Sequence, residues 1–325
     1  MYSLILVDYN SLDATISYIE RCTKALGKAG TSHIVIVENG SDENAAEYLR
    51  QSYGPWELLH PEGISQTLYL FSTEDRQIVY CHSGGNLGYA KGNNLGVRIA
   101  QTLWADPYYI VSNNDIDFDG PFALEIAREL FDTHPEIGVI GPQVITPAGQ
   151  VQSPRKWIGA YRRLVVFIQL CSVGNILPAK LYTKIKALLC EDLCVDAPTG
   201  PCGWVSGCFM MIRASAFHKA EMFDPNTFLY AEEPILSRRM ERAGYSVWFL
   251  RELTVIHKHA QTTKNALSRL RIMELDFNSM WYYYKTYTSA SNFVLGLAKC
   301  NFAIFKCIHP IWNKLKNLGK KKSAE

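Results

Sequence analysis

The stretch Tyr108-Tyr-Ile-Val-Ser-Asn-Asn-Asp115-Ile-Asp117 decides the fold, because an apolar, β-rich run ends abruptly in amides and carboxylates. This pattern is typical of a buried parallel strand that carries ligands to the carboxyl edge of a sheet. Carboxylate and carbonyl oxygens at a strand tip suit a hard divalent cation, which in turn suits a diphosphate. We therefore predict Asp115 as a metal ligand and keep Asp117 as a second candidate.

The sequence around this stretch alternates between apolar strand-like runs and helical spacing of apolar residues. A strand at 3–7, a helix at 11–27, a strand at 33–37 and a helix at 45–51 give a β-α-β-α order. This order predicts an α/β fold with a mostly parallel sheet flanked by helices. Residues 54–76 look irregular. Further strands are expected at 77–81, 138–141, 203–212, 246–250 and 255–257, and further helices at 90–103, 121–131 and 228–243.

The chain of 325 residues is long enough for one large domain with an extension. We expect a catalytic domain over 1–265 and a helical, basic and aromatic extension over 266–325. Residues 155–194 mix basic and apolar residues at helical spacing and also predict helices. The formal net charge of +2 gives no global attraction to nucleic acid.

The nine cysteines are odd in number and irregularly spaced, which favours reduced thiols in a cytosolic compartment. We see no signal peptide and no apolar run of about 18 residues that would span a bilayer. The C-terminal lysines, at 314, 316 and 320–322, follow aromatic residues such as those at 281–284. That combination suits the anionic inner face of a cell membrane. The alternative is a helix that packs on the catalytic domain.

Polar residues follow the first two predicted strands and fill the loop before the third helix. Tyr9 and Asn10 end the first strand, where a tyrosine can stack on a base. Glu38 ends the second, where it either accepts the imide N–H of a pyrimidine or is a solvated loop acid. In the segment 84–94, glycines permit close approach to phosphates and amides can bind sugar and base oxygens. This segment matches neither G-x-G-x-x-G nor a P-loop.

Two acids and a histidine farther along are also candidates. Glu232 and Glu233 open a helix, where they act as a general base or merely complement the helix dipole. His257 ends a short apolar strand and is either a structural residue or a further metal ligand.

In this order the motifs resemble the family 2 glycosyltransferases of the GT-A fold, in particular their rhamnosyltransferase-like branch. The resemblance covers most of residues 3–263. It rests on Val7-Asp-Tyr-Asn10, Val37-Glu-Asn-Gly-Ser41, Asn86-Leu-Gly-Tyr-Ala-Lys-Gly-Asn-Asn94, Asn113-Asn-Asp115, Gly207 and the strand after it, Phe223-Asp224, Tyr230-Ala-Glu232-Glu233, Arg239, Gly244-Tyr245 and Val255-Ile-His257.

The resemblance implies an inverting transfer of a sugar from a UDP- or dTDP-sugar to a hydroxyl of a glycan or lipid-linked acceptor, in polysaccharide synthesis. It implies Glu233 as the base, with Glu232 beside it, and Mg²⁺ or Mn²⁺ held by Asp115 and His257. The implied donor-binding residues are Tyr9, Asn10, Glu38, Asn86, Gly88, Lys91, Asn94, Asn113 and Asn114. Trp204, Ser206 and Gly207 are implied on the acceptor and sugar side.

The chain departs from the family pattern at three places. Glu233 stands where the family has Asp, Pro234 and Ile235 replace residues of Glu-Asp-x-Asp-Leu, and Asp8 replaces Thr. These changes bear on the placement of the base, so a nucleotide-sugar-binding protein without turnover is the alternative function. A nucleotidyltransferase would need a Gly-rich, basic N-terminal loop, which Asp8-Tyr-Asn10 does not provide.

Overall fold

The computed structural model describes residues 1–26, 33–40, 45–119, 124–156, 193–258 and 268–322. The chain divides into two compact units. The first runs over Met1–Trp157 and Leu193–Ala266, and the second contains the C-terminal helices. Most of the predicted helices at 155–194 lie outside the described residues.

The first unit is built on one mixed sheet with the strand order β10-β12-β8-β11-β6-β1-β2-β5-β4-β3; β7 pairs with β12 and β9 with β8. The strands are β1 Tyr2–Asp8, β2 His33–Glu38, β3 Trp56–Leu59, β4 Leu68–Ser72, β5 Gln77–His82, β6 Tyr108–Ser112, β7 Ile116–Phe118, β8 Ile137–Ile145, β9 Val151–Ser153, β10 Gly200–Pro201, β11 Phe209–Arg213 and β12 Ser246–His257. This is the predicted α/β architecture with a large, mostly parallel sheet.

Strands β6, β1, β2 and β5 run parallel in the centre of the sheet. Their register aligns Asp8 with Glu38 and Glu38 with His82. It also aligns Leu6 with Ser112, so the residues after Ser112 reach the same edge as Asp8. The polar residues that end these strands therefore meet at one edge of the sheet.

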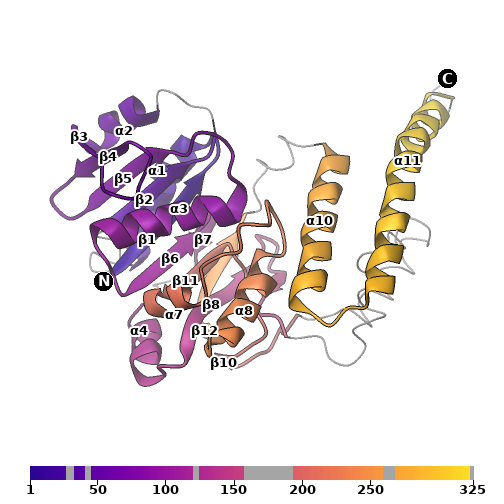
Figure 1. Ribbon diagram of the computed structural model, residues 1–325. Helices are drawn as coiled ribbons and strands as arrows, with labels where there is room; N and C mark the ends of the chain where they lie inside the picture. The colour runs from indigo at the N-terminus through magenta and orange to yellow at the C-terminus, as the bar shows by residue number, and fades with distance from the viewer. Residues whose placement is uncertain (27–32, 41–44, 120–123, 157–192, 259–267, 323–325) are drawn as a thin grey trace. The chain divides into compact units, whose positions relative to one another are not determined.

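Alternate residues of the central strands face opposite sides, as the two-residue period of a strand requires. Helices α1 (Leu12–Leu26), α2 (Ala45–Tyr53) and α4 (Leu124–Thr133) pack on one core cluster. Helices α3 (Gly88–Leu103), α7 (Ala214–Lys219) and α8 (Glu232–Arg242) pack on the other. In Figure 1, α3 crosses one face of the sheet along its length. The sheet is thus covered on both faces, which explains its nearly continuous apolar strands.

Three expectations from the sequence are wrong in detail. The stretch 54–76 is not irregular throughout, because it contains the antiparallel pair β3–β4. The two strands expected at 246–250 and 255–257 are one strand with a bulge, β12. The strand expected over 203–212 begins only at Phe209, since the residues before it form turns and an isolated bridge.

The second unit contains two long helices, α10 (Arg269–Tyr287) and α11 (Asn292–Lys322). The rings of Phe277 and Phe302 stack at 4.1 Å, and Trp281 Nε1 donates a hydrogen bond to the carbonyl of Leu295. Among the described residues, no helix is both long and apolar enough to cross a membrane.

Candidate functional site

Glu38 is buried at the tip of β2, with only 1% of its surface exposed, so it is not the solvated loop acid of the alternative interpretation. The backbone N–H of Gly40 donates to Glu38 Oε1 at 2.5 Å, and His82 Nε2 lies 3.3 Å from Oε2. The N–H of Gly84 donates to His82 Nδ1 at 3.1 Å. That bond places the proton of a neutral His82 on Nε2, which faces the carboxylate.

Asp8, which departs from the family pattern, forms a buried hydrogen-bonded network at the tip of β1. Its carboxylate accepts bonds from the backbone and hydroxyl of Ser11 and from the hydroxyl of Thr15. The amide of Asn114 donates to Asp8, Ser11 and Thr15 at 3.3, 2.9 and 2.8 Å. The network fixes Asn114 after β6 and therefore helps to place its neighbour Asp115.

The N-terminus of α3 is held against the tip of β2. Asn39 donates to the carbonyl of Gly88 at 3.0 Å and accepts from the N–H of Leu87 at 3.3 Å. Asn86 accepts from the N–H of Gly88 at 2.9 Å. Gly88 has φ +74°, and an added Cβ would lie 2.3 Å from the carbonyl oxygen of Phe228, so this position requires glycine.

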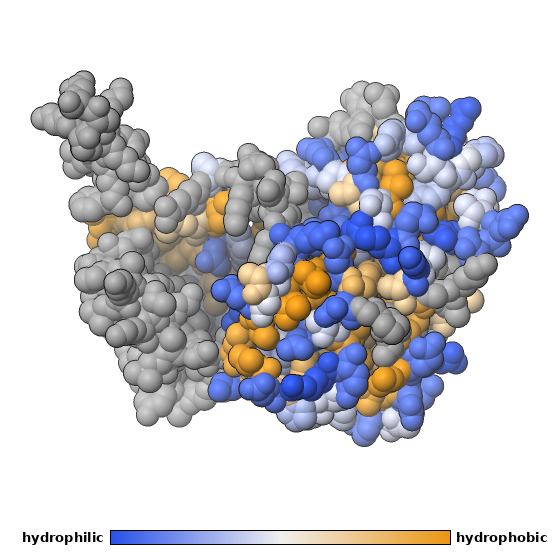
Figure 2. All heavy atoms as spheres, turned by 180° about the vertical axis from the view of Figure 1, so that it is seen from behind, coloured by the Kyte–Doolittle hydropathy of each residue, from blue (hydrophilic) through white to orange (hydrophobic). Residues whose placement is uncertain are grey.

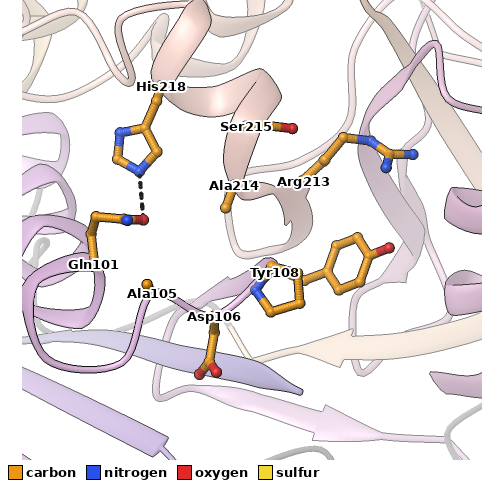
Figure 3. Close-up of a pocket in the computed structure, with 9 residues that line it drawn as sticks. Gln101, Ala105, Asp106, Tyr108, Arg213, Ala214, Ser215 and His218 are labelled. Carbon is orange, nitrogen blue, oxygen red and sulfur yellow. Dashed lines mark hydrogen bonds between the residues drawn. The ribbon is translucent and has the colours of Figure 1, made fainter.

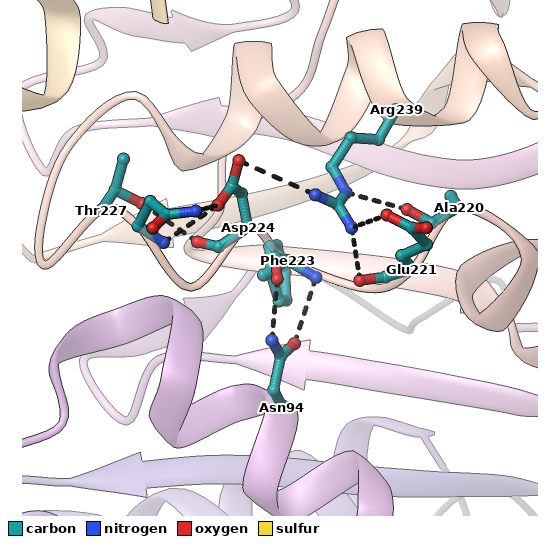
Figure 4. Close-up of polar contacts among 8 residues, drawn as sticks. Asn94, Ala220, Glu221, Phe223, Asp224, Thr227 and Arg239 are labelled. Atoms are coloured by element: carbon teal, nitrogen blue, oxygen red, sulfur yellow. Dashed lines mark hydrogen bonds and ion pairs between the residues drawn. The ribbon is translucent and has the colours of Figure 1, made fainter. Parts of the chain in front are cut away.

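Two predicted donor-binding residues on α3 differ in their surroundings. Lys91 is exposed in the first turn of the helix. Asn94 is buried. Its amide nitrogen donates to the carbonyl of Phe223 at 2.8 Å, and its amide oxygen accepts from the N–H of the same residue at 3.1 Å. Asn94 thus ties α3 to the loop before α8 (Figure 4). Both polar atoms of the Asn94 side chain are thus used in contacts within the protein.

Three further predicted residues, Tyr9, Asn10 and Asn113, lie at the same edge of the sheet. Tyr9 is half-buried and Asn10 exposed, with φ +53°. The side-chain oxygen of Asn10 lies where a Cβ on Gly40 would project. The backbone N–H of Asn113 donates to the carbonyl of Cys208 at 2.9 Å. These contacts join the tips of β1, β2 and β6 to the segment that leads into β11.

Asp115 and His257 meet at the ends of two elements that are far apart in the sequence. His257 Nε2 lies 3.3 Å from Asp115 Oδ2, and Nδ1 of the same ring lies 3.3 Å from Gln152 Oε1 on β9. When Nδ1–H donates to Gln152, the lone pair of Nε2 faces a carboxylate oxygen, and a cation between them would relieve the repulsion. A carboxylate and an imidazole held in this way fit a divalent metal.

Asp117 belongs to a different set of contacts. Arg21 Nε lies 3.0 Å from one of its oxygens and Lys258 Nζ 2.5 Å from the other. Two cations therefore already compensate its charge, which favours Asp115 over Asp117 as a ligand. No cluster of three or more His, Cys, Asp or Glu residues suited to a metal occurs in the described part of the chain. A full coordination shell would need oxygens from a bound ligand.

Glu233 faces the turn that precedes β11. Its Oε1 accepts a hydrogen bond from the N–H of Gly207 at 3.1 Å. The hydroxyl of Tyr89 donates to the carbonyl of the same glycine at 2.6 Å. A Cβ on Gly207 would lie 3.0 Å from the Tyr89 hydroxyl oxygen and 3.2 Å from Glu233 Oε1, so the three groups are in close contact. Glu232 is buried at the first position of α8.

The predicted acceptor-side residues Trp204 and Ser206 lie just before this turn. The guanidinium of Arg155 lies over the ring of Trp204, 5.1 Å from its centroid, and the N–H of Arg155 donates to the Trp204 carbonyl. The N–H of Ser206 donates to the hydroxyl of Ser153 on β9 at 3.2 Å. Strand β9 therefore supports both this segment and, through Gln152, the imidazole of His257.

Cys208 connects the metal candidate with the base candidate. Burial raises the pKa of its thiol to about 12, a hydrogen bond from Ser206 opposes this, and the charges of Asp115 and Glu233 raise the pKa further. The backbone here also contacts both segments, because the carbonyl of Cys208 accepts from the N–H of Asn113 at 2.9 Å and the N–H of the neighbouring Gly207 donates to Glu233 at 3.1 Å. The turn before β11 therefore adjoins both the segment that carries Asp115 and the side chain of Glu233, although 118 positions separate these two acids in the sequence.

The loop before α8 is fixed by Arg239 (Figure 4). Its guanidinium donates to the carbonyls of Ala220 and Glu221 at 2.8 and 2.6 Å and lies 3.7 Å from the buried carboxylate of Asp224. Tyr230 and Ala231, which end this loop, both have left-handed φ values, of 75° and 65°. Such values strain residues other than glycine, and strain of this kind is concentrated at functional sites.

A pocket of about 350 Å³ lies at the other edge of the sheet, near the start of β6 and the end of β11 (Figure 3). Its polar side chains bind within the protein. Asp106 accepts from Ser3 and pairs with His33, both at 2.7 Å. Arg213 donates to backbone carbonyls, and His218 pairs with Gln101. We therefore place the candidate site at the carboxyl edge, away from this pocket.

Two residues of the site, His82 and Gln152, were not singled out from the sequence. Asp8, Tyr89 and Arg239 stood in the quoted motifs, but no role was predicted for them. The position of His82 at the end of a strand was an indication that it belongs to the site, because this strand is aligned with the one that ends at Glu38. Gln152 had none, since β9 is only three residues long and its contact with His257 spans 105 positions.

The fold is that of the GT-A glycosyltransferases. A structure of GalNAc-T7 with UDP, GalNAc and Mn²⁺ superimposes with a TM-score of 0.52 at 11% identity, over 80% of this chain and 44% of that one. At this identity the likeness concerns the fold alone. No protein-family model matches the chain.

Curated relatives confirm the resemblance to glycosyltransferases. One is the N-acetylglucosaminyl-diphospho-decaprenol L-rhamnosyltransferase of Mycobacterium tuberculosis, 27% identical over 188 residues, which are 56% of this chain and 59% of the relative. Another is the low-salt glycan biosynthesis hexosyltransferase Agl10 of Haloferax volcanii, 25% identical over 69% of this chain and 66% of the relative. The chain thus spans less than two thirds of the length of these relatives.

Proposed function

We propose that this protein is an inverting, metal-dependent glycosyltransferase. It transfers a sugar from a UDP- or dTDP-sugar to a hydroxyl of a glycan or lipid-linked acceptor in cell-surface polysaccharide or glycan synthesis. The observation that carries this proposal is the turn before β11, where the carbonyl of Cys208 accepts from the N–H of Asn113 and the N–H of Gly207 donates to Glu233. The metal candidate and the base candidate thus adjoin one short segment. The names of the curated relatives support the same class of reaction.

On this proposal, the nucleobase binds beside Tyr9 and donates its imide N–H to Glu38. His82, whose side chain is 42% exposed, turns away from Glu38 Oε2 to admit it. Asn10, Asn86, Gly88 and Lys91 lie on the donor side, with Asn113 and Asn114 at the tip of β6. Trp204 and Ser206 face the sugar and acceptor.

Glu233 takes the proton of the acceptor hydroxyl as its oxygen forms the bond to the anomeric carbon and the bond to the diphosphate breaks. Asp115 and His257 would hold Mg²⁺ or Mn²⁺, which when bound supplies positive charge for the leaving diphosphate. Glu233 is one methylene longer than the aspartate of the family pattern. The bond from Gly207 N–H to Oε1 fixes the position of this longer side chain.

The first test is a thermal-shift screen against nucleotide-sugars, with and without Mn²⁺. We expect a UDP- or dTDP-sugar to raise the melting temperature, and to raise it more with Mn²⁺. Sugar transfer to a panel of acceptors then separates an enzyme from the alternative, a nucleotide-sugar-binding protein without turnover. A shift with neither transfer nor donor hydrolysis would favour the binding protein, and no shift with any nucleotide-sugar would contradict both.

We also propose that α11 rests on an anionic membrane surface, on the inner face of the cell membrane. Phe293, Leu297, Ile304 and Ile308 are 80, 43, 59 and 52% exposed. Their spacing of four, seven and four residues places them on one side of the helix. Leu295, Ala298 and Phe302 on the opposite side are buried. The helix carries lysines and no acidic residue, so its charge complements anionic lipid.

On the face of the first unit that Figure 2 shows, hydrophobic areas are interrupted by hydrophilic residues. We expect the full chain to sediment with vesicles that contain phosphatidylglycerol and to remain in solution with phosphatidylcholine alone. Phe293→Ser combined with Ile304→Ser should abolish sedimentation. Leu58→Ser combined with Ile126→Ser, which changes exposed apolar residues of the first unit, should not. A dimer that the α11 changes dissociate, without vesicle binding, would show that a second copy covers the stripe instead.

A further inference from the structure

We propose that Tyr89 is a positioning residue for the base Glu233 and couples it to the donor loop. This inference rests on the proposed function, because it assigns Tyr89 a role through Glu233. Tyr89 lies in the first turn of α3, directly after the loop that is predicted to bind the donor.

The contacts of Tyr89 reach the base through one residue. Its hydroxyl donates to the carbonyl of Gly207 at 2.6 Å, and the N–H of Gly207 donates to Glu233 Oε1 at 3.1 Å. The two bonds hold both sides of the same glycine. Gly207 precedes β11 in a turn, so its orientation is set by such contacts rather than by pairing in the sheet. Without the bond from Tyr89, Gly207 would be free to turn. Its N–H would then no longer orient the carboxylate of Glu233.

Both the backbone and the ring of Tyr89 are held in place by neighbouring residues. The backbone N–H of Tyr89 donates to the carbonyl of Phe228 at 3.0 Å, and its carbonyl accepts from the amide of Asn93 at 2.9 Å. Its ring packs edge-on against Phe223, with centroids 5.4 Å apart. These partners lie on α3 and on the loop that leads into α8. A movement of the donor loop would therefore reach the base through Tyr89.

Tyr89 remains a hydrogen-bond donor at all pH values at which the enzyme would work. Burial raises the pKa of its hydroxyl well above the usual value, and the nearby charges of Glu233 and Glu232 raise it further. A neutral phenol beside two carboxylates can donate but does not add a third negative charge. We therefore assign Tyr89 an orienting role and no role in proton transfer.

The test is a double-mutant cycle of Tyr89→Phe and Glu233→Gln in the full chain, assayed by sugar transfer. Tyr89→Phe alone should lower kcat about tenfold, the scale of one lost hydrogen bond, with donor KM nearly unchanged. In the Glu233→Gln background the same change should cost less than about twofold, because residues that act through one another are not additive. An equal loss of kcat in both backgrounds, or no loss in either, would overturn the inference.

Tyr109→Phe is the matched control. Tyr109 is buried, whereas Tyr89 is partly buried, and the hydroxyl of Tyr109 donates to Gln101 at 2.7 Å at the other edge of the sheet. It should alter the melting temperature as much as Tyr89→Phe and leave kcat unchanged. Hydrogen exchange at the Gly207 amide, followed by NMR, needs no activity: Tyr89→Phe should accelerate it and Tyr109→Phe should not. Wild-type protein without transfer would refute the proposed function, whereas unchanged exchange in Tyr89→Phe would refute this inference.

Discussion

The two edges of the central sheet both bury carboxylates, but they use them differently. At the amino edge Asp106, only 5% exposed, is bound by the hydroxyl of Ser3 and the ring of His33, each at 2.7 Å. His33 is stacked on Trp104 at 4.4 Å. Both bonds to Asp106 are short and come from residues of the neighbouring strands β1 and β2. This is how a buried charge is stabilised when nothing else needs to bind.

At the carboxyl edge Asp115 faces the imidazole of His257 at the longer distance of 3.3 Å, and Glu233 faces a single backbone N–H of Gly207 at 3.1 Å. Their partners come from a turn and from the last residue of a strand. The comparison teaches that burial alone does not mark a functional acid. What distinguishes Asp115 and Glu233 is that the segment of the first and the side chain of the second both adjoin the turn before β11, at the edge where the parallel strands end.

Replacing one acid at each edge should give the largest difference in activity between the two edges. Asp115→Ala should lower sugar transfer by about 1000-fold or more, because it removes the proposed carboxylate ligand of the metal. Asp106→Asn should leave kcat unchanged and lower the free energy of unfolding by about 1–3 kcal/mol, since it disturbs buried hydrogen bonds. Transfer assays and urea unfolding measure the two effects. Full activity in Asp115→Ala would mean that the metal assignment is wrong.

The next largest effect is expected at Glu233. Glu233→Gln keeps an oxygen for the bond from Gly207 but cannot accept a proton, so kcat should fall roughly 100-fold or more with donor affinity retained. Glu241→Gln on the same helix is the control, because Glu241 is exposed and contacts Arg238 at the surface. Transfer kinetics and donor titration separate the two quantities. Weakened donor binding with unchanged kcat would place Glu233 on the donor instead.

A smaller effect on activity should follow from replacing Arg239, which supports the loop before α8. Arg239→Ala removes the bonds to Ala220 and Glu221 and leaves Asp224 buried without its nearby guanidinium (Figure 4). We expect a loss of about 2–3 kcal/mol in the free energy of unfolding. Because the loop leads through Tyr230 and Ala231 to α8, transfer should also fall modestly. Arg238→Ala, one position earlier, should change unfolding by much less.

The contrast between the edges also explains what the sequence could reveal. Strand tips such as Glu38 and Asp115 were predictable, since each ends an apolar run and parallel strands align their carboxyl ends. The contact between Tyr89 and Gly207 was not, because it spans 118 positions and depends on how a helix sits on the sheet. Strands β3 and β4 were missed although 68–72 is rich in β-forming residues. Their half-exposed pattern at the edge of the sheet resembles a loop.

The smallest predicted effect lies at the amino edge and concerns pH. Burial lowers the pKa of His218 below its ordinary value of 6.5, and the ring pairs with Tyr109 and Gln101. The unfolded chain therefore binds this proton more readily than the folded one, so stability should fall as pH drops through about 6.5 and level off below the folded pKa. Urea unfolding between pH 5 and pH 8 measures the slope, and His218→Gln should reduce it. An unchanged slope in that variant would assign the pH dependence to other groups.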